Sequence, residues 1–283
     1  MTRTLTALSA RRRHPLAVVV LIALALVLVG GLYAALAPRQ AEASTATASA
    51  EDVEAGKRLF LANCSTCHGL NAQGGGVTEN GRGAEGAQNP GPSLIGVGAA
   101  SVDFQVGSGR MPLAQSGPQA PKVNKIRFSQ EQIDLMAAYI ASLAPGPAIP
   151  TEEQLDVSEV GDERLARGAA IFRTNCAMCH NFAGKGGALT EGKYAPSLDE
   201  SSAKHIYEAM LTGPQSMPVF NDSTISSEDK TAIIAWLTQD EKRPDPGGLT
   251  LGAVGPVSEG LFAWIAGIGL LIGCSVWLGM KSS

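Results

Sequence analysis

The sequence has few aromatic residues, only 5% of 283, and no excess of basic residues, since 22 Lys and Arg face 26 Asp and Glu. The formal net charge is −4 at pH 7. A surface that binds nucleic acid needs clustered positive charge to neutralise phosphates, so we expect no nucleic-acid partner. The 33 glycines fit small domains and loop-rich linkers equally well, and therefore do not decide the fold.

Cysteine is also scarce, and the five cysteines do not form an even-numbered set. Four of them form two Cys-x-x-Cys pairs, Cys64 with Cys67 and Cys176 with Cys179, whereas Cys274 lies in an apolar run. An odd number in this arrangement argues against a disulfide framework. The two pairs therefore indicate another chemistry.

An apolar run without charge covers residues 16–37. At ~1.5 Å per residue a helix of this length crosses a hydrocarbon core of ~30 Å. The arginines at 11–13 precede it, and positive residues stay on the cytoplasmic side, so the N-terminus is predicted to be cytoplasmic. The alternative is a cleaved signal peptide, with a small-residue site near 41–43. We favour the uncleaved membrane helix because the run is long for a signal peptide.

A second uncharged apolar run covers residues 261–280, and Lys281 follows it directly. If the middle of the chain lies outside the cytoplasm, a helix here must return to the cytoplasm, and the lysine agrees with that direction. Cys274 is interpreted as a small apolar residue of this membrane helix.

Stretches rich in Pro, Gly, Ser and acidic residues divide the rest of the chain. We expect an all-α protein in which two compact regions lie between the membrane helices. The predicted parts are a cytoplasmic N-terminus at 1–15, a membrane helix or signal segment at 16–37, a linker at 38–50, a first domain at 51–145, a linker at 146–160, a second domain at 161–242, a linker at 243–260 and a membrane helix at 261–280.

The two regions are copies of each other. Residues 55–68 and 167–180 share Gly, Phe, Asn, both cysteines and a final His at matching positions. Each copy continues with Pro-Ser-Leu, then Met-Pro, and ends in an amphipathic helix, predicted at 130–143 and 227–238. Ser129 and Gln132 form a capping-box pattern before the first of these helices. Gly56 and Gly168 leave room for a second helix to cross closely, so we expect the first and last helices of each copy to pack together.

Each Cys-x-x-Cys pair is followed directly by a histidine, His68 in the first copy and His180 in the second. Cys-x-x-Cys-His is the attachment pattern of c-type haem: the two thiols add to the vinyl groups and the histidine binds the iron. Two copies with matching flanks make this a strong signal. Zinc is the rival, but the pairs lie far beyond the ~15–20 residues usual between such pairs, and the histidines would be unexplained. A thioredoxin-like redox dithiol is the other alternative, but the βαβ pattern expected around it is lacking in this sequence.

The sixth iron ligand must come from elsewhere in each copy. Met111 and Met217 each precede a proline that stiffens the loop, and a thioether opposite histidine raises the iron potential. Met210 and His205 are rivals of Met217, but Met210 lies in a helical pattern and His205 reads as a surface helix residue. Because both copies offer a methionine, neither iron looks vacant, which disfavours a peroxidase.

Pro92 and Pro196 are candidates for a supporting role. A backbone carbonyl that accepts the Nδ1–H of the ligand histidine would fix the ring orientation, as supporting groups do at metal sites. The alternative is that both are simple turn prolines.

Each copy resembles a class I cytochrome c domain, on the opening Gly/Phe helix, Cys-x-x-Cys-His, the Pro-x-Leu turn, the Met-Pro loop and the closing helix. The whole layout resembles the dihaem cytochrome c subunits of actinobacterial menaquinol–cytochrome c reductases (cytochrome bcc complexes). The stretches 184–190, 192–196 and 210–215 strengthen that likeness. Compared with a minimal class I domain, the first copy has insertions near 81–89 and 117–127.

The resemblance implies a function that spacing cannot show. Such a subunit takes electrons from a Rieske iron–sulfur protein and passes them through two covalent haems c to an aa3-type cytochrome c oxidase. It works beside a cytochrome b subunit in a dimeric supercomplex, with the haem domains outside the cytoplasmic membrane, and does not itself bind quinol or catalyse independently. The alternative is a dihaem membrane carrier that serves a different dehydrogenase or terminal reductase.

Overall fold

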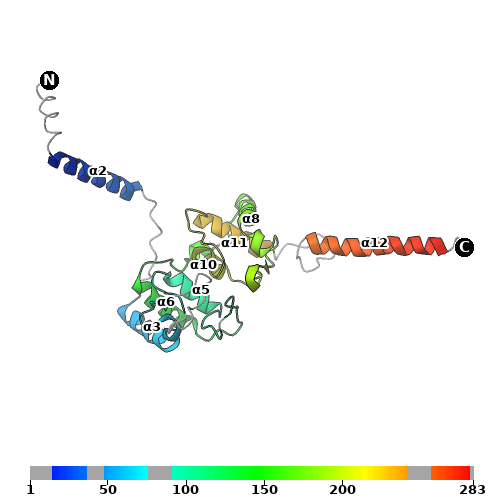
Figure 1. Cartoon of the computed structure of the whole chain (residues 1–283), viewed down its shortest axis with the longest axis horizontal. Coiled ribbons are helices and arrows are strands. Elements are labelled where there is room, and N and C mark those ends of the chain that lie inside the picture. The colour runs from blue at the N-terminus through cyan, green and yellow to red at the C-terminus, as the bar shows by residue number, and fades with distance from the viewer. Residues whose placement is uncertain (1–14, 37–47, 76–90, 116, 241–255, 281–283) are drawn as a thin grey trace, which may run out of the picture. The chain divides into compact units, whose positions relative to one another are not determined.

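The computed structural model describes residues 15–36, 48–75, 91–115, 117–240 and 256–280 (Figure 1). The described part is mostly helical, as expected. The chain divides into two units, Met1–Ser44 and Thr45–Ser283, and the second unit contains both Cys-x-x-Cys-His sequences.

The helix α2, Pro15–Leu36, is the described element of the first unit. At the other end of the chain, α12 covers Pro256–Met280. Within α12, the stretch Ser258–Met280 is long and apolar enough to cross a membrane, whereas the apolar stretch found in α2, Val18–Leu32, is shorter. The described side chains of both stretches are largely exposed, which suits an apolar surrounding.

In the described part of the first domain the helices are α3 (Ala50–Asn63), α4 (Ser65–His68), α5 (Gly98–Gly107) and α6 (Gln130–Leu143). The capping box predicted before α6 is present, because Ser129 Oγ accepts from the Gln132 amide and the Gln132 side chain accepts from the Ser129 amide. The closing helix therefore begins where the sequence indicated.

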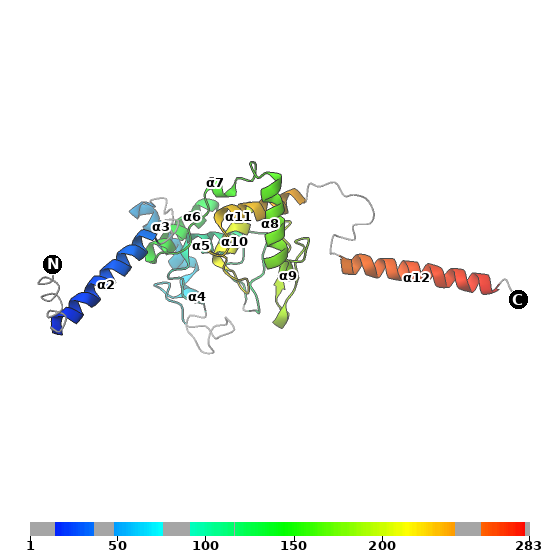
Figure 2. The same cartoon turned by 90° about the horizontal axis from the view of Figure 1, so that it is seen from above.

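The second domain repeats this order with α8 (Asp162–Asn175), α9 (Ala177–His180), α10 (Ala203–Thr212) and α11 (Ser227–Asp240). Figure 2 shows α8 beside α11. A two-stranded antiparallel ribbon that the sequence did not reveal joins β1 (Gly187–Ala188) to β2 (Tyr194–Ala195). A 3-10 turn at Thr190–Gly192 closes it. With two residues a strand, the ribbon is too short to leave an alternating pattern.

The first and last helices of each domain cross at the predicted glycines. A Cβ on Gly56 would lie 1.9 Å from the Leu135 carbonyl oxygen, and one on Gly168 would lie 2.2 Å from the Ala232 carbonyl oxygen. Beside these crossings an aromatic pair fills each core, and the ring centroids of Phe172 and Trp236 are 4.7 Å apart. The missing side chain at each glycine lets the two backbones touch, which confirms the expected packing.

The segment 146–160, expected as a linker, contains the short helix α7, Glu152–Leu155. Leu155 packs against the core of the second domain. The Gln154 side chain donates to Tyr207 Oη at 3.1 Å, and its backbone carbonyl accepts from Thr231 at 2.8 Å. These contacts hold the segment on the surface of the second domain.

The two domains also contact each other directly, through α5 and α10 and through the segment 117–127. The Gln119 side chain makes two hydrogen bonds to the backbone of Tyr194, at 2.9 and 2.8 Å. Lys204 lies with its Nζ 2.8 Å from Asp103 Oδ2. The insertion recognised in the first copy is therefore used, at least in part, to bind the second domain.

Candidate haem sites

Each Cys-x-x-Cys-His sequence folds as one short helical turn after the opening helix. The Cys64 amide donates to the Phe60 carbonyl at 2.7 Å, and the His68 amide donates to the Cys64 carbonyl at 3.0 Å. The corresponding distances from Cys176 and His180 are 2.8 and 2.9 Å. The same hydrogen bonds thus place two thiols and one imidazole on a single turn in both domains.

The histidine rings are oriented by proline carbonyls. His68 Nδ1 lies 2.8 Å from the Pro92 oxygen, and His180 Nδ1 lies 3.0 Å from the Pro196 oxygen. A carbonyl can only accept, so Nδ1 carries the hydrogen and Nε2 of the neutral ring keeps its lone pair for a metal. Burial lowers the pKa of His180, outweighing the bond to Pro196, and so favours this neutral form.

Gly91 is a residue that the sequence reasoning missed. A Cβ at this position would lie 2.8 Å from His68 Nδ1 and 2.8 Å from the Cys67 carbonyl oxygen, and the Gly91 amide donates to that oxygen. The backbone can therefore approach the histidine ring only because no side chain is present. The sequence did offer a clue to the role of Gly91, because this glycine directly precedes Pro92, the candidate partner of His68.

The four thiols are free; Cys64, Cys176 and Cys179 are half-buried, whereas Cys67 is exposed. Burial, with a smaller contribution from the neighbouring thiol, raises the pKa of Cys64 and of Cys176 to about 11. Within the described ranges, the cysteines do not gather into a group of metal ligands. The zinc alternative thus finds no support.

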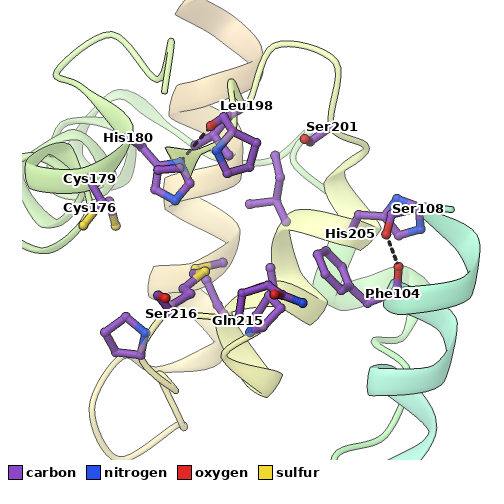
Figure 3. Close-up of a pocket in the computed structure, with 18 of the residues that line it drawn as sticks. Phe104, Ser108, Cys176, Cys179, His180, Leu198, Ser201, His205, Gln215 and Ser216 are labelled. Atoms are coloured by element: carbon purple, nitrogen blue, oxygen red, sulfur yellow. Dashed lines mark hydrogen bonds between the residues drawn. The ribbon is translucent and has the colours of Figure 1, made fainter. Parts of the chain in front are cut away.

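A cavity of about 1180 Å³, its open mouth included, lies against the second Cys-x-x-Cys-His turn. Figure 3 shows Cys176, Cys179 and His180 entering it from one wall. Met217, half-buried, also lines it, as does Pro196. Cofactor sites in proteins are largely apolar, and the lining of this cavity fits that description. Further apolar residues complete the wall: Phe172, Leu189, Leu198, Ile206, Phe220 and Ile233.

The two rivals of Met217 lie at the same cavity. Met210 is only 2% exposed and belongs to the core of the second domain. The interpretation of His205 as a surface helix residue is wrong, because the ring packs edge-on against Phe104 of the first domain, with centroids 5.9 Å apart. Sequence reasoning could not see this contact, since the partner lies in the other domain.

The first domain contributes part of this wall through Arg110, Gln119 and Lys122 as well as Phe104. The Arg110 guanidinium lies 4.9 Å above the centre of the Phe104 ring, and Arg110 directly precedes Met111. The side chain that lines the second site thus adjoins the candidate ligand of the first.

Fewer of the residues around the first Cys-x-x-Cys-His turn are among those that the structure describes. Met111, half-buried, packs against the first core together with Cys64. The insertion predicted near 81–89 lies outside the described residues. The hydrogen bonds of the turn, the histidine and the proline carbonyl nevertheless match those of the second domain.

These residues fit a covalently bound haem: two free thiols on one turn, an imidazole with its Nε2 lone pair available and, at the second turn, a cavity lined mainly by apolar residues. A helical domain that presents this turn is a cytochrome c. The chain in fact matches the family "Cytochrome c" over residues 53–144, and the family "Cytochrome C oxidase, cbb3-type, subunit III" over residues 163–237.

Curated relatives narrow the class further. Proteins named "Cytochrome bc1 complex cytochrome c subunit" are 43% identical in Corynebacterium efficiens, over 85% of this chain and 82% of the relative. They are 41% identical in Mycobacterium bovis, over 96% and 93%, and 40% identical in Corynebacterium diphtheriae, over 85% and 86%. The chain belongs to the family of cytochrome bc1 complex cytochrome c subunits. It is an electron-transfer protein whose cytochrome c domains bind haem c covalently.

Proposed function

We propose that this chain is the membrane-anchored dihaem subunit of a respiratory menaquinol–cytochrome c reductase. It relays electrons from a Rieske iron–sulfur protein, through two haem sites, to an aa3-type cytochrome c oxidase. The observation that carries the proposal is the pair of equivalent Cys-x-x-Cys-His turns within a chain that aligns over most of its length with bc1 complex cytochrome c subunits.

The residues of each site have distinct tasks. Cys64 and Cys67, and likewise Cys176 and Cys179 in the second domain, hold the group by thioether bonds. His68 and His180 donate Nδ1–H to the proline carbonyls, which fixes the rings and leaves Nε2 for the iron. A bound haem supplies an iron that changes oxidation state by one electron.

Met111 and Met217 are the sixth ligands in this proposal. Met217 lines the second cavity, and in the first domain Met111 and Cys64 both pack against the core. A soft thioether opposite an imidazole raises the reduction potential, which suits a carrier late in a respiratory chain. If a methionine and a histidine both bind the iron, it would have no open position for peroxide.

The proposed partners are a cytochrome b subunit, the Rieske protein and the oxidase, in a dimeric supercomplex. The relatives' name supports a place within a bc1-type complex. Inside the chain, the shared wall of the second site supports passage from one domain to the other, because Arg110 adjoins Met111 and also lines the cavity around His180. Quinol chemistry belongs to the partners.

We also propose that the protein spans the cytoplasmic membrane twice, with both cytochrome domains outside. The arginines at 11–13 keep the N-terminus inside, and Lys281 keeps the C-terminus inside. The length and composition of Ser258–Met280 support the second crossing. An intact mass that includes residues 1–40 would support the uncleaved first helix, whereas a mature protein beginning near residue 44 would show that it is a signal peptide.

The proposal is tested by purifying the tagged chain from native membranes in mild detergent and measuring menaquinol-driven oxygen uptake. Co-purification of a cytochrome b, a Rieske protein and an oxidase, with activity, is the expected result. A dihaem protein that purifies alone, or with a different dehydrogenase, would refute the respiratory assignment and leave the haem sites intact.

The ligand assignment has its own test, Met217→Ala against the control Met210→Leu. We expect Met217→Ala to keep the haem attached, since the thioether bonds do not involve methionine, and to lower the potential of the second haem. Met210→Leu conserves volume in the core and should leave the potential unchanged. An unchanged potential and ligand-field spectrum in Met217→Ala would show that another residue binds the iron. Cys176→Ser should instead weaken or prevent haem attachment in the second domain.

A further inference from the structure

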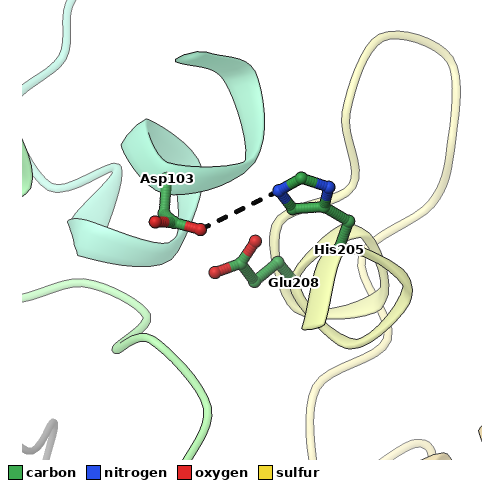
Figure 4. A group of neighbouring side chains, drawn as sticks. All are labelled: Asp103, His205 and Glu208. Carbon is green, nitrogen blue, oxygen red and sulfur yellow. Dashed lines mark ion pairs between the residues drawn. The ribbon is translucent and has the colours of Figure 1, made fainter. Parts of the chain in front are cut away.

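Three side chains that can bind a metal converge where the two cytochrome domains meet, beside the second haem cavity, whose wall includes His205. Asp103 comes from α5 of the first domain, and His205 and Glu208 come from one face of α10, a single turn apart (Figure 4). One ligand atom from each lies within 4.8 Å of the others. His205 Nε2 is 4.0 Å from Asp103 Oδ2, and the Glu208 carboxylate points toward both residues (Figure 4).

The buried Glu208 side chain faces Asp103, and burial, together with the charge of Asp103, raises the pKa of Glu208 to about 10. The residue is 0% exposed, yet neither of its oxygens has a hydrogen-bond partner among the described residues. Buried carboxylates are normally hydrogen-bonded, paired with a cation or bound to a metal, because water no longer solvates them. A cation between the three side chains would satisfy both oxygens.

Asp103, 1% exposed, is already held in place for such a role. Its Oδ1 accepts from the Gln130 side chain at 2.7 Å, which leaves Oδ2 directed at α10. Lys204 Nζ lies 2.8 Å from Oδ2 and forms an ion pair with it. The Lys204 side chain is 29% exposed, so it can move into solvent when another cation takes its place.

We propose that Asp103, His205 and Glu208 form a binding site for a divalent transition-metal ion that links the two cytochrome domains. Two carboxylates and one imidazole are a ligand set that suits zinc, and water would complete a tetrahedron. Bonds of ~2.0–2.2 Å place ligand atoms about 3.4 Å apart, so the three groups must close by roughly 1 Å. The ion would hold α5 against α10 and displace Lys204 from Asp103.

The test uses the full chain with haem attached, stripped of metal with a chelator and equilibrated by dialysis against Zn²⁺. Zinc and protein are measured in each chamber, for the parent and four variants. The parent should bind one zinc ion per chain. Glu208→Gln, which keeps the shape of the side chain, and His205→Asn should each weaken binding by at least the ~10–100-fold that loss of a supporting residue costs at metal sites.

Two further variants separate this site from other sources of binding. Glu200→Gln removes a carboxylate that is 82% exposed on the same domain, and it should bind zinc like the parent. Lys204→Gln removes the competing ammonium and should bind zinc more tightly. Absence of stoichiometric binding in the parent, or equal binding in Glu208→Gln and His205→Asn, would overturn the proposal. Haem absorption spectra confirm folding in every variant, and neither result depends on the respiratory assignment.

Discussion

The crossing of α8 and α11 makes a prediction in which two physical effects have opposite signs. Gly168 lies inside α8, where glycine costs about 1 kcal/mol relative to alanine, so propensity alone predicts that Gly168→Ala stabilises the protein. The structure predicts the reverse. The new Cβ would lie 2.2 Å from the Ala232 carbonyl oxygen and 2.4 Å from its carbon, and both belong to the backbone of a packed helix.

The magnitude follows from how far the helices must move. Contacts of real Cβ atoms are rarely shorter than 3.0 Å, so α11 has to retreat by nearly 1 Å at this point. That retreat loosens the core that α8 and α11 share, including the pair Phe172 and Trp236. Overpacking of a core costs about 1–3 kcal/mol, and the helix propensity of alanine returns part of it. We expect a net loss of roughly 1–2 kcal/mol, or about 4–16 °C in the melting temperature of a domain of this size.

The assay is unfolding of the haem-loaded chain in guanidinium chloride, followed by the fluorescence of Trp236 with Trp264 and Trp277 replaced by Phe. Gly56→Ala provides the matched change in the first domain, because its Cβ would lie 1.9 Å from the Leu135 oxygen; this domain contains no tryptophan, so its unfolding is followed by haem absorbance. A control is Ala170→Gly on the exposed face of α8, where only propensity acts. If Gly168→Ala proved as stable as the parent, or more stable, the close crossing would be refuted.

Three further predictions concern contacts outside that crossing. Arg167→Gln should destabilise the second domain modestly at neutral pH. The hydrogen bond from Arg167 lowers the pKa of Asp229 below its usual 3.8. A carboxyl whose pKa is lowered by folding stabilises the folded state at pH values above its unfolded pKa. The difference from the parent should therefore shrink as pH falls below about 4 and vanish once pH is below the lowered pKa of Asp229. The exposed Arg173→Gln should show no such dependence. Ser129→Ala removes the cap of α6 and should cost the first domain about 0.5–2 kcal/mol in denaturant unfolding, whereas an unchanged midpoint would mean that the cap contributes nothing. Gly91→Ala should push the His68 ring away from the Pro92 carbonyl and shift the reduction potential of the first haem alone. Gly161→Ala is the control, because its Cβ would meet open space, and it should leave both reduction potentials unchanged.

The sequence by itself determined the parts of this protein that depend on neighbours along the chain. Cys64, Cys67 and His68 lie within one helical turn, so their spacing predicted the attachment site directly. The capping box at Ser129 marked the start of α6 for the same reason. Because the two domains are copies, each inference made for one domain applied to the other. Gly56 and Gly168, at matching positions, predicted that the opening and closing helices of each domain would cross.

Only the tertiary structure decided how the two domains meet, because the groups involved are far apart along the chain and carry no common pattern. Gln119 binds Tyr194 across 75 positions, and the segment around it had been recognised only as an insertion. His205 was predicted to be a surface helix residue, but its ring packs against Phe104 of α5 in the other domain. The burial of Glu208 follows from the same contact. A side chain's partners are local along a helix, but its solvation depends on whatever folds against that helix, and that is a property of the whole structure.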